Sequence, residues 1–303
     1  MSQAVVFPGQ GSQFVGMADP WLEHDASRTV LERASAVLGW DIPGLDEHAL
    51  SSTAVVQPAL LAVDVAAFEV LRAEGLSFIG AAGHSLGEFA ALVAAGVLDL
   101  ATALEIVGVR GRAMQAAGEA RPGTMSALLG VGAEEARAIC ERARGDEVLI
   151  VANENSPQQV VVSGSVAAVE RAEAIAADRR IRAIRLKVAG AFHSPLMEPA
   201  VGPLAEAIDA AAFAAPRFPV ASNVTGELTS DPEELRTLLK RHVVAPVRWE
   251  RCAQALRAAG ASTFVEAGPG DVLTKLARRV VPGTRAIAVG SPAEAAALAA
   301  GSA

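Results

Sequence analysis

The segment AAGHSLGEFA, residues 81–90, constrains the fold of this 303-residue chain most strongly, because it places Ser85 between two glycines. Residues 76–82 (LSFIGAA) before it predict a short buried strand, and LGEFAALVAAGVL after it has the apolar spacing of a helix. Ser85 is therefore expected on a tight turn that joins a strand to a helix.

Gly83 and Gly87 stand two residues before and two residues after this serine. Such a turn needs glycine at both places, because side chains there would collide with the neighbouring strand and helix. The Ser85 hydroxyl would then lie at a helix N-terminus, where free N–H groups can receive a developing oxyanion. The pattern indicates acyl chemistry at a serine; a chance G-x-S-x-G in a glycine-rich loop is the alternative.

The composition limits the classes of function. With 51% hydrophobic residues, the chain can bury the core of one large domain, or of one with a smaller insert. Aromatic residues make up only 4% and tyrosine is absent, so platforms that stack nucleic acid bases are not expected. The formal net charge of -8 also argues against binding a phosphate backbone. We expect no nucleic acid partner.

Neither export nor membrane insertion is expected. The N-terminus, MSQAVVFPGQGSQ, lacks the basic start and long apolar run of a signal peptide. The apolar window 89–109 is interrupted by Asp99 and Glu105, which predicts two helices joined by a turn and not a membrane span. Cys140 and Cys252 are too few and too isolated for a disulfide framework or a zinc site. A cytoplasmic location follows as the expectation.

The order of the predicted elements indicates an α/β fold. AVVFPGQGSQ predicts a strand that runs into a glycine-rich loop, and helices are predicted from Ala54 to Gly75 and over residues 99–120. Residues 124–188 then follow the order strand, helix, strand, strand, helix, strand. Long helices and short strands return from GAFHSPLM onward, and the alanine-rich tail SPAEAAALAAGSA predicts a frayed helix.

We therefore predict two domains. The larger, discontinuous α/β domain comprises residues 1–122 and 190–303, and the smaller inserted βαββαβ domain comprises residues 123–189.

A serine nucleophile requires a base, and the chain has five histidines. His24 and His48 lie in polar, acidic segments that are expected at the surface. His84 adjoins Ser85, but adjacent side chains diverge at a tight turn, so packing or support of the site is expected. His242 in KRHVVAPVRW is expected at a helix end.

His193 in VAGAFHSPLM is the candidate base, because it lies where the smaller domain returns the chain to the larger one. That position places it in a cleft between domains, where ligands tend to bind. A packing histidine is the alternative. No acidic residue stands out as the third member of a triad.

Nine segments, in order, resemble one family: the malonyl-CoA:acyl carrier protein transacylases and the related acyltransferase domains of polyketide and fatty acid synthases. The likeness extends from residue 4 to about residue 280. The segments are FPGQGSQ (7–13), QPAL (57–60), GHSLGE (83–88), RGRAMQ (110–115), NSPQQVVVSG (155–164), GAFHSPLM (190–197), SNVTG (222–226), PVRW (246–249) and EAGPG (266–270).

The resemblance implies an α/β-hydrolase-like larger domain with a ferredoxin-like insert. It implies Ser85 as the nucleophile, His193 as its base, and the backbone N–H groups of Gln10 and Leu86 as the oxyanion hole. It also implies that a main-chain carbonyl near His242 orients the base, where many members of the family have glutamine.

Arg110 is implied to bind the free carboxylate of malonyl. A planar guanidinium can grip a carboxylate through two parallel, charge-assisted hydrogen bonds, which supports this role. From the residues alone, an ordinary surface arginine like Arg112 is the alternative.

Other positions are expected to contact the substrate. Gln57, Asn155 and His84 are assigned to the lining or support of the site, with structural hydrogen bonding as the alternative. Phe192 beside the base resembles members that take malonyl and not α-branched methylmalonyl units; packing at the domain joint is the alternative.

The expected activity moves malonyl from malonyl-CoA to the phosphopantetheine thiol of an acyl carrier protein through a malonyl-serine intermediate. No metal or redox cofactor is implied, and we expect a monomer. Because the carrier proteins are acidic, Arg185 and Lys187, on one face of a predicted strand, are candidates for docking; a solvated strand face is the alternative.

Other activities share part of these features. A chain without fused domains favours fatty acid synthesis, although a polyketide pathway uses the same chemistry. A serine thioesterase or hydrolase would share Ser85 and His193, and a silent scaffold would share only the fold.

Overall fold

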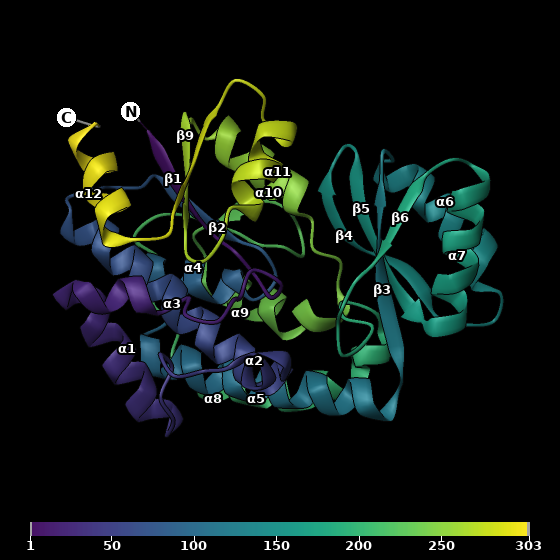
Figure 1. Cartoon of the computed structure of the whole chain (residues 1–303), viewed down its shortest axis with the longest axis horizontal. Coiled ribbons are helices and arrows are strands. Elements are labelled where there is room, and N and C mark those ends of the chain that lie inside the picture. Colours follow the sequence, from purple (N-terminus) through teal and green to yellow (C-terminus); the bar gives the residue numbers. More distant parts are fainter. Residues whose placement is uncertain (1, 302–303) are drawn as a thin grey trace.

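The computed structural model describes residues 2–301 and contains two β-sheets with helices packed on them (Figure 1). The larger sheet has the strand order β10-β9-β1-β2-β7-β8. Its strands pair in parallel, apart from the antiparallel β7 and β8. The strands are β1 (Gln3–Phe7), β2 (Gly80–Gly83), β7 (Val220–Ala221), β8 (Leu228–Thr229), β9 (Thr263–Ala267) and β10 (Arg285–Val289). This arrangement confirms the predicted α/β class.

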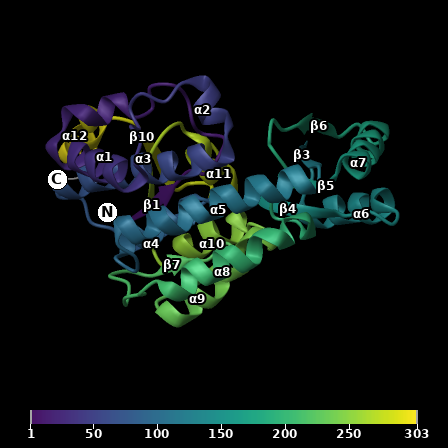
Figure 2. The same cartoon turned by 90° about the horizontal axis from the view of Figure 1, so that it is seen from below.

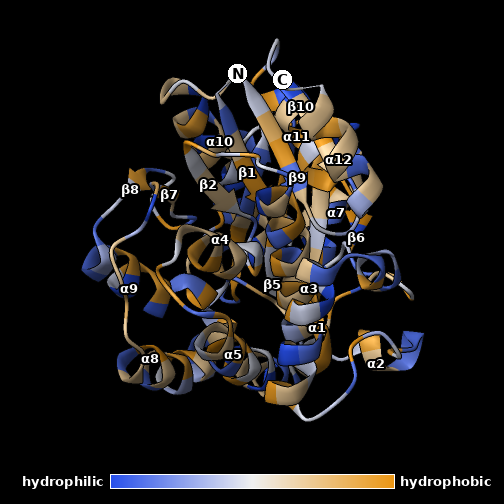
Figure 3. Ribbon diagram, turned by 90° about the vertical axis from the view of Figure 1, so that its left-hand side faces the viewer, coloured by the Kyte–Doolittle hydropathy of each residue, from blue (hydrophilic) through white to orange (hydrophobic). Residues whose placement is uncertain are grey.

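Helices cover both faces of the larger sheet, and the alternation of β1 explains why. Val5 and Phe7 join the core with helices α3 (Thr53–Ala73) and α4 (Gly87–Ala95). Ala4 and Val6 point to the opposite face. They pack with α10 (Trp249–Ala258) and α11 (Val272–Val280). A strand buried on both faces is mostly apolar, and β1 is apolar from Ala4 to Phe7. Strand β9 is fully buried too, but it includes Thr263 and Glu266, and both strands show orange, hydrophobic stretches in Figure 3.

The remaining helices surround this core. Residues 99–120 form the predicted helix, α5 (Leu100–Ala120). The tail forms helix α12 (Pro292–Ala300), which was predicted to be frayed but is anchored at its start and along one side. Ser291 caps α12 at its N-terminus, and Ala295 and Leu298 are buried, while residues 302–303 lie outside the described part of the chain. The other helices are α1 (Asp25–Leu38), α2 (Glu47–Ser51), α8 (Val201–Ala210), α9 (Pro232–Lys240), α12 (Pro292–Ala300) and the short 3-10 helices η1 (Asp19–Glu23), η2 (Pro195–Ala200) and η3 (His242–Val244).

The apolar window 89–109 forms two helices, as predicted. Helix α4 ends at Gly96 in the left-handed conformation, and Asp99 caps the start of α5 through the N–H of Thr102 at 3.0 Å. Within residues 2–301, α3 is the one helix long and apolar enough to cross a membrane. Because 83% of its most apolar stretch is buried inside the protein, α3 has the burial of a core helix.

The second sheet is antiparallel, with the order β4-β5-β3-β6. Its elements follow the predicted order of strand, helix, strand, strand, helix, strand. They are β3 (Gly123–Leu129), α6 (Ala133–Arg144), β4 (Leu149–Ser156), β5 (Gln159–Ser165), α7 (Val166–Asp178) and β6 (Arg182–Arg185). Strand β6 is shorter than the predicted strand, which extended to residue 188.

Backbone contacts join the two parts of the molecule that contain these sheets. Helix α5 leads from the larger part directly into β3, as Figure 2 shows, and the chain returns alongside it, because Gly118 lies against Ala189 and Gly190. Strand β4 also pairs with the larger part, where Val247 N–H donates to the Ala152 carbonyl at 2.8 Å.

Candidate active site

Ser85 lies on the turn between β2 and α4, as predicted. Its backbone is left-handed, with φ of 51°. A Cβ on Gly83 would overlap the backbone of Gly87, and a Cβ on Gly87 would overlap the carbonyl of Phe7 on β1. The requirement for glycine on both sides of the serine is therefore steric.

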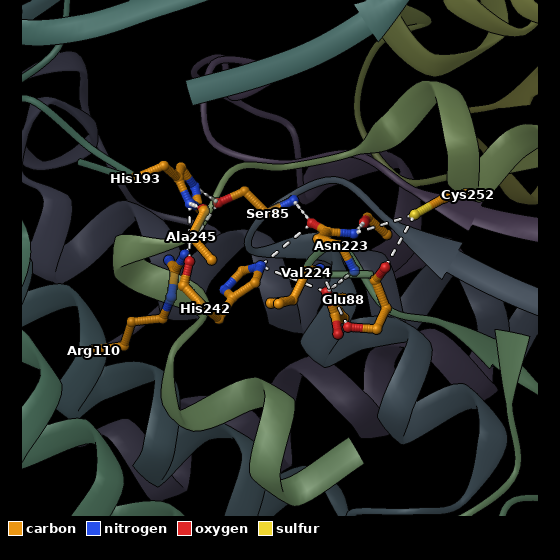
Figure 4. A network of polar contacts seen from close by, with 11 residues as sticks. Ser85, Glu88, Arg110, His193, Asn223, Val224, His242, Ala245 and Cys252 are labelled. Carbon is orange, nitrogen blue, oxygen red and sulfur yellow. Dashed lines mark hydrogen bonds and ion pairs between the residues drawn. The ribbon is translucent and has the colours of Figure 1, made fainter. Parts of the chain in front are cut away.

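His193 lies beside this serine, with its Nε2 2.7 Å from the Ser85 Oγ (Figure 4). The other ring nitrogen, Nδ1, is 3.0 Å from the His242 carbonyl oxygen and 3.1 Å from that of Ala245. Because carbonyl oxygens only accept hydrogen bonds, these contacts assign the proton to Nδ1 and leave Nε2 free to accept from the serine. Two carbonyls thus occupy the place that a carboxylate has in a triad.

The environment keeps the His193 ring neutral. Its side chain is buried, and burial together with the positive charge of Arg110 lowers its pKa from 6.5 to about 3. A neutral imidazole is the form that can take the serine proton.

Arg110 is buried, unlike Arg112, which lies two residues further along α5 and is exposed. One terminal nitrogen donates to Ser85 Oγ at 3.0 Å, and the other donates to Gln57 Oε1 at 2.7 Å. The guanidinium also lies 5.7 Å from the centre of the Phe89 ring. Burial lowers the Arg110 pKa to about 10, so the side chain stays protonated at neutral pH. The structure therefore places a buried cation directly against the candidate nucleophile.

Gln57 connects this arginine to the glycine-rich loop after β1. Its amide nitrogen donates to Gln10 Oε1 at 3.2 Å, and the Gln10 side chain donates to Thr53 Oγ1 at 3.4 Å. Gln57 is itself buried. Its side chain lines the cavity and accepts from one terminal nitrogen of Arg110.

The backbone N–H groups of Gln10 and Leu86 lie at the same end of the sheet. Gln10 follows the carboxyl end of β1, and Leu86 is the N-cap of α4. Within residues 2–301, neither backbone N–H donates to another backbone carbonyl. Both are thus available to an oxygen that is bound beside Ser85.

A cavity of about 260 Å³ opens over Ser85 between the two sheets. His84 and Asn155 line it, and their side chains meet at 2.8 Å. Phe192 is buried and forms part of its wall while packing in the main core. The residues that line the cavity from the second sheet and the chain after it are Met125, Ala127, Asn153, Asn155, Gln159, Val161, Leu186 and Val188.

The candidate docking residues are exposed, but they differ in their surroundings. The Arg185 guanidinium donates to the Glu173 carboxylate on α7 through Nε and one terminal nitrogen, at 2.7 Å each. Its charge is therefore neutralised within the chain. Lys187 lies beyond the end of β6 and is exposed.

Asn223 and Glu88 belong to the site but were not among the residues expected there. Asn223 Oδ1 accepts the N–H of Ser85 at 2.7 Å, and Glu88 Oε2 accepts the N–H of Asn223 at 2.9 Å. Burial raises the pKa of Glu88 to about 7. A single acidic residue within the apolar stretch LGEFAALVAA was the sequence feature that could have indicated it.

Comparison with known proteins gives the same family as the motifs. Residues 4–296 match the acyl transferase domain family. The chain is 38% identical over 296 residues to the malonyl CoA-acyl carrier protein transacylase of Bacillus subtilis, covering 95% of this chain and 93% of that protein.

Solved structures agree. The acyl carrier protein S-malonyltransferase of Vibrio cholerae superimposes with a TM-score of 0.94 at 39% identity, covering 98% of this chain and 100% of that one. A malonyl-transacylase in complex with a type II PKS acyl-carrier protein has a TM-score of 0.94 at 36% identity, covering 100% of both chains. Motifs, sequence and fold thus lead to one conclusion: the chain belongs to the acyl transferase domain family.

Proposed function

We propose that this protein transfers malonyl from malonyl-CoA to the phosphopantetheine thiol of an acyl carrier protein. The contact between Arg110 and Ser85 carries the proposal, because a buried cation 3.0 Å from a nucleophile suits an acyl group that ends in a second carboxylate. The names of the relatives, which are malonyl transacylases, support the same substrate.

In the first half of the reaction, Ser85 Oγ attacks the thioester carbonyl while His193 Nε2 takes its proton. The carbonyl oxygen becomes an oxyanion that the N–H groups of Gln10 and Leu86 stabilise. When the C–S bond breaks, His193 returns the proton to the sulfur, CoA leaves as a thiol, and malonyl remains as an ester on Ser85.

The second half reverses these steps with another thiol. The phosphopantetheine thiol of the carrier gives its proton to His193 and attacks the ester. Collapse of the tetrahedral intermediate breaks the C–O bond, and His193 protonates the Ser85 oxygen. The chain's own residues supply each proton transfer, and the proposal assigns no step to a metal or redox cofactor.

The proposal includes the finer description of the fold. The parallel sheet with a serine on a strand-to-helix turn supports an α/β-hydrolase-like domain, made of residues 1–122 and 190–303. The antiparallel βαββαβ unit supports a ferredoxin-like domain of residues 123–189. A monomer in the cytoplasm remains the expectation from the sequence.

Phe192 is proposed to limit the acyl group to malonyl. Its ring forms part of the cavity wall, immediately before the base in the chain. An α-methyl group would compete with the ring for this space. Substitution of Phe192 by serine should raise the ratio of methylmalonyl to malonyl transfer.

The carrier is proposed to belong to fatty acid synthesis, with polyketide synthesis as the alternative. A fold neighbour in complex with a polyketide carrier favours keeping that alternative. Lys187 is the better docking candidate, since Arg185 is paired with Glu173. Reversing the charge of both residues should raise the KM for an acidic carrier; an unchanged KM would exclude this docking surface.

The experiment for the function is the intact mass of the protein after brief incubation with malonyl-CoA. We expect a malonyl adduct on the wild type, removed by a holo carrier protein, and no adduct on Ser85→Ala or from acetyl-CoA. Free CoA without an adduct would instead identify a thioesterase. An intact donor and an unlabelled protein would reject the proposal.

A further inference from the structure

We propose that the side chains of Asn223 and His242 form a positioning bridge, which holds Ser85 and His193 at the right distance and orientation to each other. The inference rests on the proposed function, in which these two residues are nucleophile and base. It adds that two further side chains, outside the cavity, set the distance between them.

The first half of the bridge fixes the backbone of the nucleophile. The left-handed conformation of Ser85 turns its N–H inward, where Asn223 Oδ1 accepts it at 2.7 Å. An uncapped N–H at this depth would cost about 1–3 kcal/mol, so the turn depends on this acceptor. Asn223 thus stabilises a conformation that few residues other than glycine adopt.

The amide of Asn223 is held in one orientation. Its Nδ2 donates to the Gly83 carbonyl at 2.7 Å, on the strand that precedes the serine. Its backbone N–H donates to Glu88 Oε2 at 2.9 Å, on the helix that follows the serine. Asn223 is completely buried. It therefore joins both elements that flank the turn.

The second half of the bridge passes through His242. Its Nε2 is 3.3 Å from Asn223 Oδ1, and its carbonyl is one of the two that accept from His193 Nδ1. Figure 4 shows the resulting closed ring: Ser85 to His193, His193 to the His242 backbone, the His242 side chain to Asn223, and Asn223 back to Ser85. His242 therefore contributes its side chain to the site as well as its backbone carbonyl.

The groups around the His242 imidazole keep it neutral and able to donate a hydrogen bond. Glu88 Oε2 lies 3.5 Å from its Nε2, and Nδ1 has no partner within residues 2–301. Burial lowers the pKa of His242 well below its usual value, and the nearby Arg110, His193 and His84 lower it further. With one proton, on Nε2, the ring donates to the oxygen of Asn223.

The test compares Asn223→Ala and His242→Ala with Cys252→Ala. Cys252 is a matched control, because it is buried, and its sulfur contacts Asn223 Nδ2 at 3.9 Å and the Ser222 carbonyl at 3.4 Å outside the ring. Two rates are measured: labelling of Ser85 by a fluorophosphonate, and malonyl transfer with its kcat and KM. Thermal unfolding checks that each variant folds.

We expect Asn223→Ala to lower the labelling rate and kcat by about 100-fold with little change in KM, as a small misplacement of reacting groups does. His242→Ala should lose about 10-fold, His242→Gln should restore most of that loss, and Cys252→Ala should stay within about twofold. The double variant of Asn223 and His242 should lose less than the product of the single losses, because both belong to one ring.

Equal losses in all three alanine variants would reduce the bridge to local packing and overturn the inference. A His242→Ala variant with full activity would also overturn it, because only the carbonyl would then matter. If Asn223→Ala does not fold, His242→Ala decides alone. Fluorophosphonate labelling does not depend on malonyl, so failure of the proposed substrate would leave this test intact.

Discussion

Arg110 is the residue that we propose to select the acyl group. Its two terminal nitrogens are held by Ser85 Oγ and Gln57, so the guanidinium is oriented before any substrate arrives. A preoriented fork that grips a carboxylate adds binding energy without a further loss of side-chain entropy.

Replacing Arg110 with alanine should therefore lower kcat/KM for malonyl-CoA by at least about 100-fold, the equivalent of about 3 kcal/mol for charge-assisted bonds. Labelling of Ser85 by an uncharged acyl donor should fall far less. Steady-state kinetics with both donors measures the difference. Equal losses would assign Arg110 to the general activation of the serine and not to substrate choice.

His193 should work as a base at unusually low pH. Burial and the charge of Arg110 lower its pKa to about 3, so in the free enzyme it is neutral over the whole range from pH 5 to 8. Labelling of Ser85 by a fluorophosphonate should show no acidic limb near pH 6.5. Arg110→Ala removes one cause of the low pKa of His193 and should move the limb to higher pH. A wild-type limb at 6.5 would contradict the assigned environment.

Local geometry predicted the turn that holds Ser85, while the domain boundary and the family resemblance predicted His193 and Arg110. The place of Ser85 follows from Gly83 and Gly87, which are its near neighbours in the chain. Asn223 could not be found in this way, because its contact with Ser85 joins residues 138 positions apart. A segment that is polar in sequence becomes part of the site only when the sheet brings it there.

Glycine positions show how the packing of elements depends on single atoms. Gly83 faces the backbone of Gly87, whereas Gly202, in α8, is exposed and has open space around its Cβ position.

Gly83→Ala should destabilise the protein by about 3 kcal/mol or more, because helix α4 would have to move away from β2. Gly202→Ala should change the stability by no more than about 0.5 kcal/mol, because the position is exposed and has open space around it. Urea unfolding of both variants measures these changes. Similar stabilities for the two would show that β2 and α4 can separate without cost.

Element boundaries were predicted where a long periodic pattern sets them. Helices α3 and α5 lie within two residues of the expected ends. The strand expected at residues 76–82 begins only at Gly80, because its partner β1 starts at Gln3 and the register pairs Ala4 with Gly80. The residues before Ile79 have no strand to pair with. Pairing, which is a property of two segments, sets the length of a strand.

Glu88 links the site to the stability of the whole molecule. Burial raises its pKa from the ordinary value of 4.5 to about 7 in the folded protein. Between these values the native state binds more protons than the unfolded state, so this group lowers the unfolding free energy as the pH rises.

Glu88→Gln removes this contribution. The unfolding free energy of the variant relative to the wild type should therefore increase between about pH 4.5 and pH 7, by up to about 3 kcal/mol. The difference in unfolding free energy between the variant and the wild type should change little above pH 7. Urea unfolding at pH 5 and at pH 8 measures it. A difference that is independent of pH would show that Glu88 does not bind a proton on folding.

The close approach of Gly118 to Ala189 and Gly190 has a consequence for how such an enzyme can diversify. The chain leaves and re-enters the larger part at this one seam, so the segment between Gly118 and Ala189 can be remodelled as a unit as long as the pairing of β4 with Val247 is kept. It supplies Met125, Ala127, Asn155 and Val161 to the cavity wall, while Ser85, Arg110 and His193 all lie outside it. The shape of the acyl pocket can therefore change by mutation or grafting on one side of the seam, while the chemistry on the other side is inherited intact.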